Sequence, residues 1–150
     1  MAKKSRTPGN IINRRARYDY ALGDSLVVGL ELSGAEAKSL RLGHGQLRGA
    51  YVAEHNDELY LINAQIISSK GVPIPDDKQS RSRKILAKRR EIDSLIAAHQ
   101  QGNSIVPLEL LTRGRYIKLR IAVGRGKKRF DKRETIKRRQ QEREARRVAT

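Results

Sequence analysis

The stretch of residues 126–139, GKKRFDKRETIKRR, has the composition of a site that binds a polyanion. It holds eight Lys and Arg side chains, two acids and only two clearly apolar residues, Phe130 and Ile136. Lys and Arg bind phosphates and release their counterions, and an aromatic ring such as that of Phe130 can stack on an unpaired base. The same composition also fits a solvated charge run or a localisation signal, and the ring could equally anchor a tail to a domain.

The basic residues are concentrated at the two ends of the chain. Of the formal net charge of +17, residues 1–17 contribute +6 and residues 124–150 contribute +8, whereas the long middle section, 18–123, contributes only +3. Basic extensions on a nearly neutral body are typical of proteins that bind nucleic acid. A membrane surface is the weaker alternative, because the extensions lack the set of Trp, Phe and Leu side chains that an interfacial helix buries.

No pattern of residues indicates catalysis. The three histidines are scattered and form no metal-ligand pair. The Gly-His-Gly stretch at 43–45 lacks the spacing of a dinucleotide fingerprint, and a phosphate loop ending at Gly126 and Lys127 would need Gly in place of Ile121 and Ser or Thr in place of Lys128. No pair of carboxylates lies in an apolar setting that would tune one of them as an acid. We therefore expect no enzymatic activity, no metal site and no cofactor.

Length and composition indicate one domain with basic extensions. A chain of 150 residues can form one hydrophobic core, and the absence of Cys excludes disulfides and fits a reducing compartment. There is no apolar run of membrane-spanning length and no apolar segment of a secretory signal. We expect a cytoplasmic protein with a basic N-terminal arm at 1–12, a barrel at 13–123 and a basic C-terminal tail at 124–150.

The hydrophobic pattern predicts a mostly β fold. Alternating apolar residues and turn signals predict five strands and two helices; the strands are at 26–32, 46–54, 58–66, 104–112 and 115–123, and the helices at 35–42 and 85–100, with a loop at 70–82. Pro107 should lie at an edge or a bulge. With no repeated βαβ unit, this order favours an OB-like antiparallel β-barrel with accessory helices. A generic α+β sandwich remains the alternative.

The tail is predicted to be a conditional helix. Asp131 and Glu134 have the spacing of a capping box, and Glu134 and Arg138 form an attractive i,i+4 pair. The apolar residues are too few for a core-facing stripe, so the helix has little to bury. We expect the tail to be largely disordered when free and helical from about Lys132 when bound to a phosphate surface.

Several short blocks occur in a specific order along the chain. They are Asn-Arg-Arg-Ala at 13–16 leading to Asp-Tyr at 19–20, Glu-Ala-Lys-Ser-Leu-Arg at 36–41, Arg-Ser-Arg-Lys-Ile-Leu at 81–86, Arg-Glu-Ile at 90–92, Val-Pro-Leu at 106–108, and Gly-Lys-Lys at 126–128 followed by Asp-Lys-Arg at 131–133. Together they resemble the SsrA-binding protein (small protein B) family over residues 10–143. Each block alone is weak, whereas the collinear set is specific.

The resemblance implies an OB-like barrel that binds the tRNA-like domain of transfer-messenger RNA (tmRNA). Such a protein accompanies the charged RNA, with elongation factor Tu, to bacterial ribosomes stalled on messages without a stop codon, where trans-translation rescues them. The tail is expected to enter the decoding centre of the small-subunit rRNA and the vacant mRNA channel as a helix. We expect a monomer when RNA is bound.

Residue roles follow from position in the matching blocks. The resemblance implies tmRNA binding by Asn13, Arg14, Arg15, Glu36, Lys38, Ser39, Arg41, Arg83, Lys84, Leu86 and Lys88. It implies contacts with the decoding centre and mRNA channel by Gly126, Lys127, Lys128, Phe130, Asp131, Lys132, Arg133, Ile136, Lys137 and Arg138. Phe130 fills a position often held by His or Tyr, and stacking on a ribosomal base would suit all three rings.

The chain departs from the family pattern at several positions, which indicates a divergent lineage with an adjusted RNA partner. Val27 lies where some members carry an acid, Lys88 replaces a His or Asn, and the Asn-His-Asp-Pro segment is replaced around residues 75–77. Ala35 and Ala37 replace a common Thr and Val.

Other interpretations remain open. Glu36 could complement a helix dipole and orient a neighbouring Arg, and Leu86 could pack rather than recognise RNA. Arg81, Arg83 and Lys84 could lie in a solvated loop. The competing function is a structural ribosomal protein with basic rRNA-binding extensions. A nuclear protein with a localisation signal at 127–139 would explain the charge but not the motifs.

Overall fold

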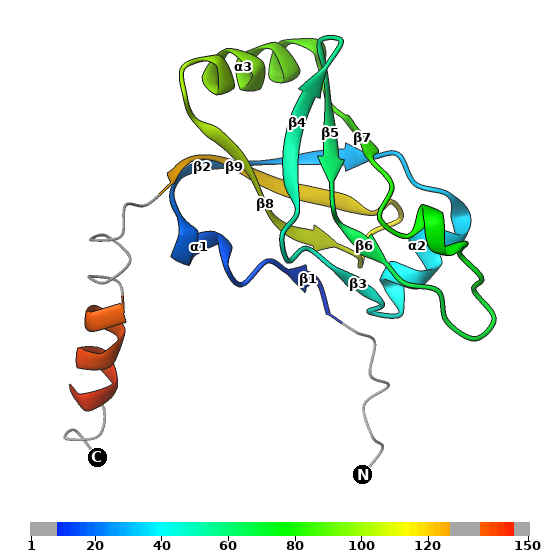
Figure 1. The fold of residues 1–150 in the computed structure, drawn as a ribbon, viewed down its shortest axis with the longest axis horizontal. Coiled ribbons are helices and arrows are strands. Elements are labelled where there is room, and N and C mark those ends of the chain that lie inside the picture. The colour runs from blue at the N-terminus through cyan, green and yellow to red at the C-terminus, as the bar shows by residue number, and fades with distance from the viewer. Residues whose placement is uncertain (1–8, 127–135, 146–150) are drawn as a thin grey trace.

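The computed structural model describes residues 9–126 and 136–145, and strands dominate the body of the molecule (Figure 1). In chain order the elements are β1 (Ile11–Ile12), α1 (Ala16–Asp19), β2 (Tyr20–Leu30), α2 (Gly34–Arg41), β3 (Gly45–Gln46), β4 (Tyr51–His55), β5 (Glu58–Ile62), β6 (Gln65–Ile66), the 3₁₀ turn η1 (Asp76–Lys78), β7 (Arg83–Leu86), α3 (Arg89–Gln100), β8 (Ser104–Leu111) and β9 (Lys118–Gly126).

Seven strands form one antiparallel sheet in the order β1-β8-β9-β2-β7-β5-β4, and β3 pairs with β6. The sheet curls so that β4, at one edge, lies beside β8, near the other edge. In Figure 1, α3 lies beside the tip of the β4–β5 hairpin, while α2 lies at the opposite end near β6. The predicted mostly β, OB-like antiparallel architecture with accessory helices is therefore confirmed.

The core lies inside the curled sheet. Strand β9 illustrates why: Leu119 and Ile121 are wholly buried, whereas Lys118 and Arg120 point outward, as the period of two requires. Full burial of one such aliphatic side chain stabilises the fold by about 1.5–3 kcal/mol. The other wholly buried large aliphatic side chains are Leu40, Leu59, Leu61 and Ile85, with Leu47, Ile66 and Leu110 at 1% exposure.

The prediction of a helix over 85–100 is wrong in its first turn. Residues Arg83–Leu86 form strand β7, and helix α3 begins only at Arg89, with Lys88 as its N-cap. The physical reason is alternation: Arg83 and Ile85 are buried while Leu86 is exposed. An arginine counts as polar in a hydrophobic pattern even when its side chain points inward. The alternation of inward and outward residues in 83–86 could therefore not be recognised from the pattern.

Two predicted strands are interrupted, and two extend further than expected. The strand predicted at 46–54 divides around Gly49, whose φ of +76° favours glycine, and the one at 58–66 divides at Asn63, with φ +64°. Strand β2 begins earlier than residue 26, and β9 continues to Gly126, opposite Tyr20. Pro107 borders a register shift between β8 and β9, as its missing N–H predicts.

Residues 136–145 form a helix in which every residue is exposed. The predicted conditional helix of the tail includes this range. The predicted start near Lys132 lies outside the described residues, and the dependence of the helix on a bound partner stays a prediction.

Candidate nucleic-acid interface

Three predicted site residues belong to the interior rather than to the surface, and the first is Arg83. Its side chain has no exposed area, although it carries a charge. Its Nε donates to Glu36 Oε2 at 2.8 Å, and its two terminal nitrogens donate to four backbone carbonyls, those of Ala64, Lys78, Gln79 and Arg81. A guanidinium has five N–H donors, so all of them are used inside the protein.

Glu36 is the buried partner of Arg83, with a side chain only 3% exposed. It also accepts hydrogen bonds from Arg81 and from the backbone N–H of Ser33, which closes a capping box at the start of α2. Burial would raise the pKa of Glu36, but the hydrogen bonds from Arg81, Ser33 and Arg83 and the charge of Arg83 together hold that pKa below its ordinary value. Glu36 is therefore ionised at neutral pH.

Ser39 and Asn13 also hold elements together. Ser39 is wholly buried, and its Oγ donates to the carbonyl of Ile67, which ties α2 to the segment after β6. Asn13 Nδ2 donates to the carbonyl of Pro107 at 2.8 Å, and its backbone N–H donates to Leu108 at 2.8 Å. These bonds fix the chain entering α1 against β8.

The outward side of strands β7, β2 and β9 brings basic and apolar residues together. We call it the outer β-face and define it by Val27, Lys84, Leu86, Lys118 and Arg120. Register places Leu86 and Lys118 on either side of Gly29, and Val27 opposite Arg120. Leu86 is 47% exposed and Val27 is 37% exposed.

Gly29 makes the close packing of this face possible. A Cβ at Gly29 would lie 3.1 Å from Leu86 Cβ and 3.2 Å from the Leu86 carbonyl oxygen.

Arg120 pairs with Glu109 at 3.0 Å, whereas no ion pair engages Lys84 or Lys118 within the described part of the chain. The face therefore offers free ammonium groups beside exposed aliphatic carbon, a combination suited to phosphate and to the edge of a base or sugar.

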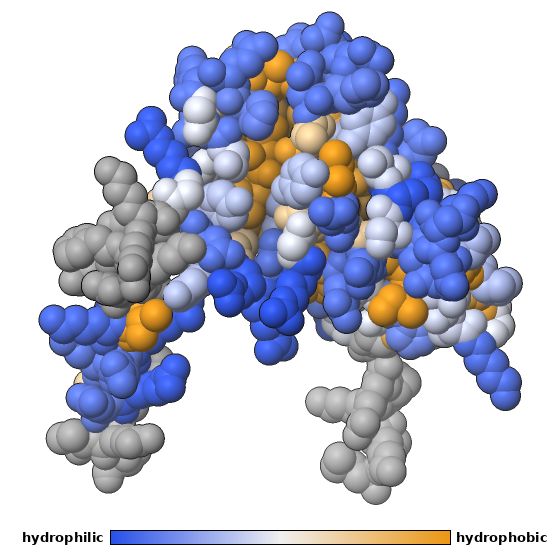
Figure 2. Space-filling view, viewed as in Figure 1, coloured by the Kyte–Doolittle hydropathy of each residue, from blue (hydrophilic) through white to orange (hydrophobic). Residues whose placement is uncertain are grey.

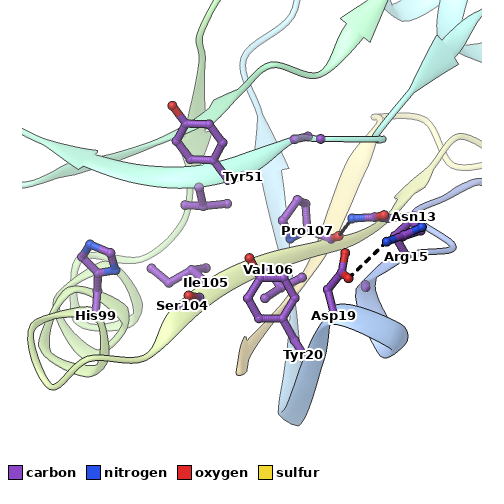
Figure 3. A pocket seen from close by; sticks show the side chains of 14 residues that line it. Asn13, Arg15, Asp19, Tyr20, Tyr51, His99, Ser104, Ile105, Val106 and Pro107 are labelled. Atoms are coloured by element: carbon purple, nitrogen blue, oxygen red, sulfur yellow. Dashed lines mark hydrogen bonds and ion pairs between the residues drawn. The ribbon is translucent and has the colours of Figure 1, made fainter. Parts of the chain in front are cut away.

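A groove of about 360 Å³ opens between β8, the start of β4 and helix α1 (Figure 3). Its floor is apolar, and Figure 2 shows an apolar strip between β8 and β4 with hydrophilic residues on both sides. Tyr51, Tyr20 and His99 stand around it. Arg15 lies at its rim, where it pairs with Asp19 at 3.5 Å and lies 4.8 Å from the Tyr18 ring centroid.

The remaining predicted residues are on the surface or outside the described residues. Arg14, Lys38, Arg41 and Lys88 are exposed, and Lys84 is half-buried. Gly126 ends β9, and Ile136, Lys137 and Arg138 are exposed on the tail helix. The other tail residues, Lys127, Lys128, Phe130, Asp131, Lys132 and Arg133, lie outside the described residues.

The structure thus distributes the predicted tmRNA-binding residues over separate places. Arg14 and Arg15 line one surface hollow with Arg48 and Gln46, Lys84 and Leu86 lie on the outer β-face, and the buried group holds α2. Sequence reasoning missed Lys118 and Arg120 as candidates. The clean alternation in residues 116–123 could have placed them outward, next to the block at 81–86, had the strand order been known.

Among residues 9–126 and 136–145, no group of His, Cys, Asp and Glu could hold a metal ion. No helix in this part of the chain is long and apolar enough to cross a membrane.

Comparison with known proteins identifies the family. The family model for SmpB protein matches residues 10–150. The SsrA-binding protein of Oleidesulfovibrio alaskensis is 41% identical over 98% of this chain and 97% of the relative, and that of Coxiella burnetii is 42% identical over 99% and 94%. The SsrA-binding protein of Halalkalibacterium halodurans is 38% identical over 95% and 94%.

A solved structure agrees with these sequence matches. It is described as "tmRNA-SmpB: a journey to the center of the bacterial ribosome", and one of its chains is 32% identical to this one with a TM-score of 0.68. The match covers 86% of this chain and 95% of the other. The relatives are named for binding SsrA and not for a reaction, in agreement with the absence of enzymatic activity expected from the sequence. The chain belongs to the SmpB protein family of SsrA-binding proteins.

Proposed function

We propose that this protein binds the tRNA-like domain of tmRNA and delivers it to stalled bacterial ribosomes for trans-translation. The observation that carries the proposal is the extent of the family match, which includes both the barrel and the basic tail, residues 10–150. The tmRNA–SmpB structure to which the fold is similar supports the same partner and the same destination.

The barrel residues divide into contact and positioning roles in this proposal. Lys84 and Leu86 of the outer β-face and Arg14 near α1 contact the RNA, because their side chains reach solvent. Glu36, Ser39 and Arg83 are positioning residues, because their polar atoms are used in holding α2 against β6 and β7. Positioning of this kind fixes where the exposed Lys38 and Arg41 of α2 point.

The tail has a different task. Its helix at 136–145 exposes all of its residues, so its charge is available to a phosphate-lined channel. In the proposal, the basic segment from Gly126 to Arg138 occupies the decoding centre and the vacant mRNA channel. Elongation factor Tu accompanies the complex during delivery.

The test is a truncation that removes the tail and spares the sheet. Because β9 pairs with Tyr20 as far as Gly126, the shortened chain should end at residue 126. It should bind an in vitro transcript of the tRNA-like domain as the full chain does, within about twofold, and fail to support peptide tagging on ribosomes stalled in a purified translation system. A second variant, with Lys137 and Arg138 changed to Gln, separates loss of charge from loss of chain length. Failure of the full-length protein to bind the transcript would refute the proposed function, and equal loss of binding and tagging in the truncated chain would refute the division of labour.

A further inference from the structure

The loop that joins β8 and β9 presents an aromatic ring to solvent on a fixed base. Thr112 and Ile117 are each 5% exposed, so both ends of the loop are anchored, while the four residues between them, 113–116, are exposed. The backbone N–H of Thr112 also donates to Asn10 Oδ1 at 3.2 Å. Tyr116 is 68% exposed, the largest value among the large hydrophobic residues of the described chain.

Three arginines lie in or against this loop, and one of them lies over the ring. Arg115 lies with its guanidinium carbon 5.5 Å from the ring centroid of Tyr116, in cation–π geometry. Arg41, from α2, donates to the Arg115 carbonyl at 2.7 Å, and the Arg113 guanidinium lies beside Gly9. We call Arg41, Arg113, Arg115 and Tyr116 the hairpin patch.

The charge of the hairpin patch is not balanced within the described residues. Arg15, Arg81, Arg83, Arg89 and Arg120 all form ion pairs with carboxylates, but none of the patch arginines does so in that part of the chain. Unbalanced guanidinium groups favour an anionic partner, and a flat ring beside them favours a partner with flat faces of its own. RNA with an unpaired base supplies both.

The patch also continues the outer β-face. Tyr116 and Lys118 are exposed with the buried Ile117 between them, and Lys118 faces Gly29 of β2 beside Leu86. An RNA strand that crosses the outer β-face can therefore reach the loop without a gap in basic side chains.

We propose that Tyr116 stacks on one unpaired base of the bound RNA while Arg113 and Arg115 hold the phosphates that flank it. Arg41 positions the loop through its bond to the Arg115 carbonyl. The site rests on the proposed function and deepens it by assigning a base-stacking anchor. Of the residues in the hairpin patch, only Arg41 was predicted from the sequence as an RNA contact. The RNA can come from tmRNA or from the ribosome, because both contain unpaired nucleotides.

The experiment measures the affinity of full-length protein for two probes, the tRNA-like transcript and tmRNA-free ribosomes. Loss of one stacked base predicts a weakening of about 5- to 150-fold for Tyr116→Ala with at least one probe, and the probe affected identifies the source of the base. Tyr116→Phe should keep the affinity, and Tyr116→Leu should lose it like Ala, since stacking needs the ring. The Arg113→Gln, Arg115→Gln double variant should make the plot of log affinity against log salt less steep. The magnitude of its slope should fall by about 1.4, the value for two single-strand phosphates. Arg90→Gln, an exposed arginine on α3, is the matched charge control.

The outcomes separate the two proposals. If the wild-type protein binds neither probe, the proposed function fails. If wild type binds and Tyr116→Ala binds equally well to both probes, or if Leu replaces Tyr116 without loss, the stacking site is overturned. Unchanged RNA affinity with loss of elongation factor Tu recruitment would assign the patch to a protein and overturn it as well. Thermal melting followed by circular dichroism is the control for folding. The melting temperature of the Tyr116 variants should stay close to that of wild type, because the ring is exposed.

Discussion

The substitution Glu36→Gln tests whether the Glu36–Arg83 pair is an internal support or an RNA contact. Gln keeps the size of the side chain and can still accept the Ser33 N–H at the third position of α2, so the capping box survives. What disappears is the negative charge beside a guanidinium with no exposed area. Removing one partner of a buried ion pair costs about 3–5 kcal/mol, because the other charge stays buried without compensation.

The expected result is a large loss of stability in urea. With a slope of about 1–3 kcal/mol per molar urea, the midpoint for Glu36→Gln should fall by at least about 1 M. The matched control is Glu58→Gln, which removes the partner of Arg89 from a pair whose side chains are 29% and 50% exposed. Its midpoint should stay within error of wild type, since solvent screens such pairs. Equal midpoints for the two variants would refute the buried-charge argument.

The pH dependence of the same pair has a definite sign. Burial alone would raise the pKa of Glu36, but hydrogen bonds from Arg81, Ser33 and Arg83 outweigh that effect and lower this pKa in the folded state. The folded protein therefore binds fewer protons than the unfolded one, and the stabilisation is complete above the ordinary carboxyl pKa of about 4.3. It declines as the pH falls below that value toward the lowered pKa, so the stability gap between wild type and Glu36→Gln should narrow there. A gap that widens toward acid pH would contradict the assignment.

Two further predictions concern the barrel surface. Gly29→Ala should destabilise the protein by about 1–3 kcal/mol, because its Cβ would crowd Leu86 at 3.1 Å. The control Gly126→Ala, whose Cβ would meet no described residue within 4 Å, should leave the stability unchanged, and urea midpoints measure both effects. Arg14→Gln should weaken binding to the tRNA-like transcript and lower its salt slope by about 0.7–0.9 if Arg14 holds one phosphate, and an unchanged slope would remove it from the interface. Arg89→Gln is the charge control, because that arginine is engaged with Asp93 and Glu58.

The sequence was sufficient for those features that depend on local chemistry. The alternation around Leu119 and Ile121 predicted β9, and the resemblance of the collinear blocks predicted the family. Pro107 was predicted at an edge or a bulge because it lacks an N–H, and it borders a register shift between β8 and β9. For the strand and the bulge a few neighbouring residues contain the information, whereas the family is indicated by the order of several short blocks along the chain.

Features that depend on distant contacts were not predictable in the same way. Glu36 and Arg83 are 47 positions apart, and only their meeting in space shows why an arginine can be an inward residue of β7. The close approach of Gly29 to Leu86 becomes apparent only from the register of β2 and β7, as does the position of Leu86 on an exposed face. The departure at Val27 becomes interpretable only with that register, because it adds an exposed apolar group opposite Arg120.

Helix α2 connects the buried support to the surface on which RNA is proposed to bind. Glu36 and Ser39 hold its inner side to the segments around β6 and β7, while Arg41 on its last turn reaches across to the Arg115 carbonyl. Loosening α2 should therefore disturb the loop at 113–116 without touching it. Glu36→Gln, measured without urea at a temperature where it remains folded, should then weaken RNA binding only as far as Arg41→Gln does. The two effects should not add, because both act through the position of the same loop.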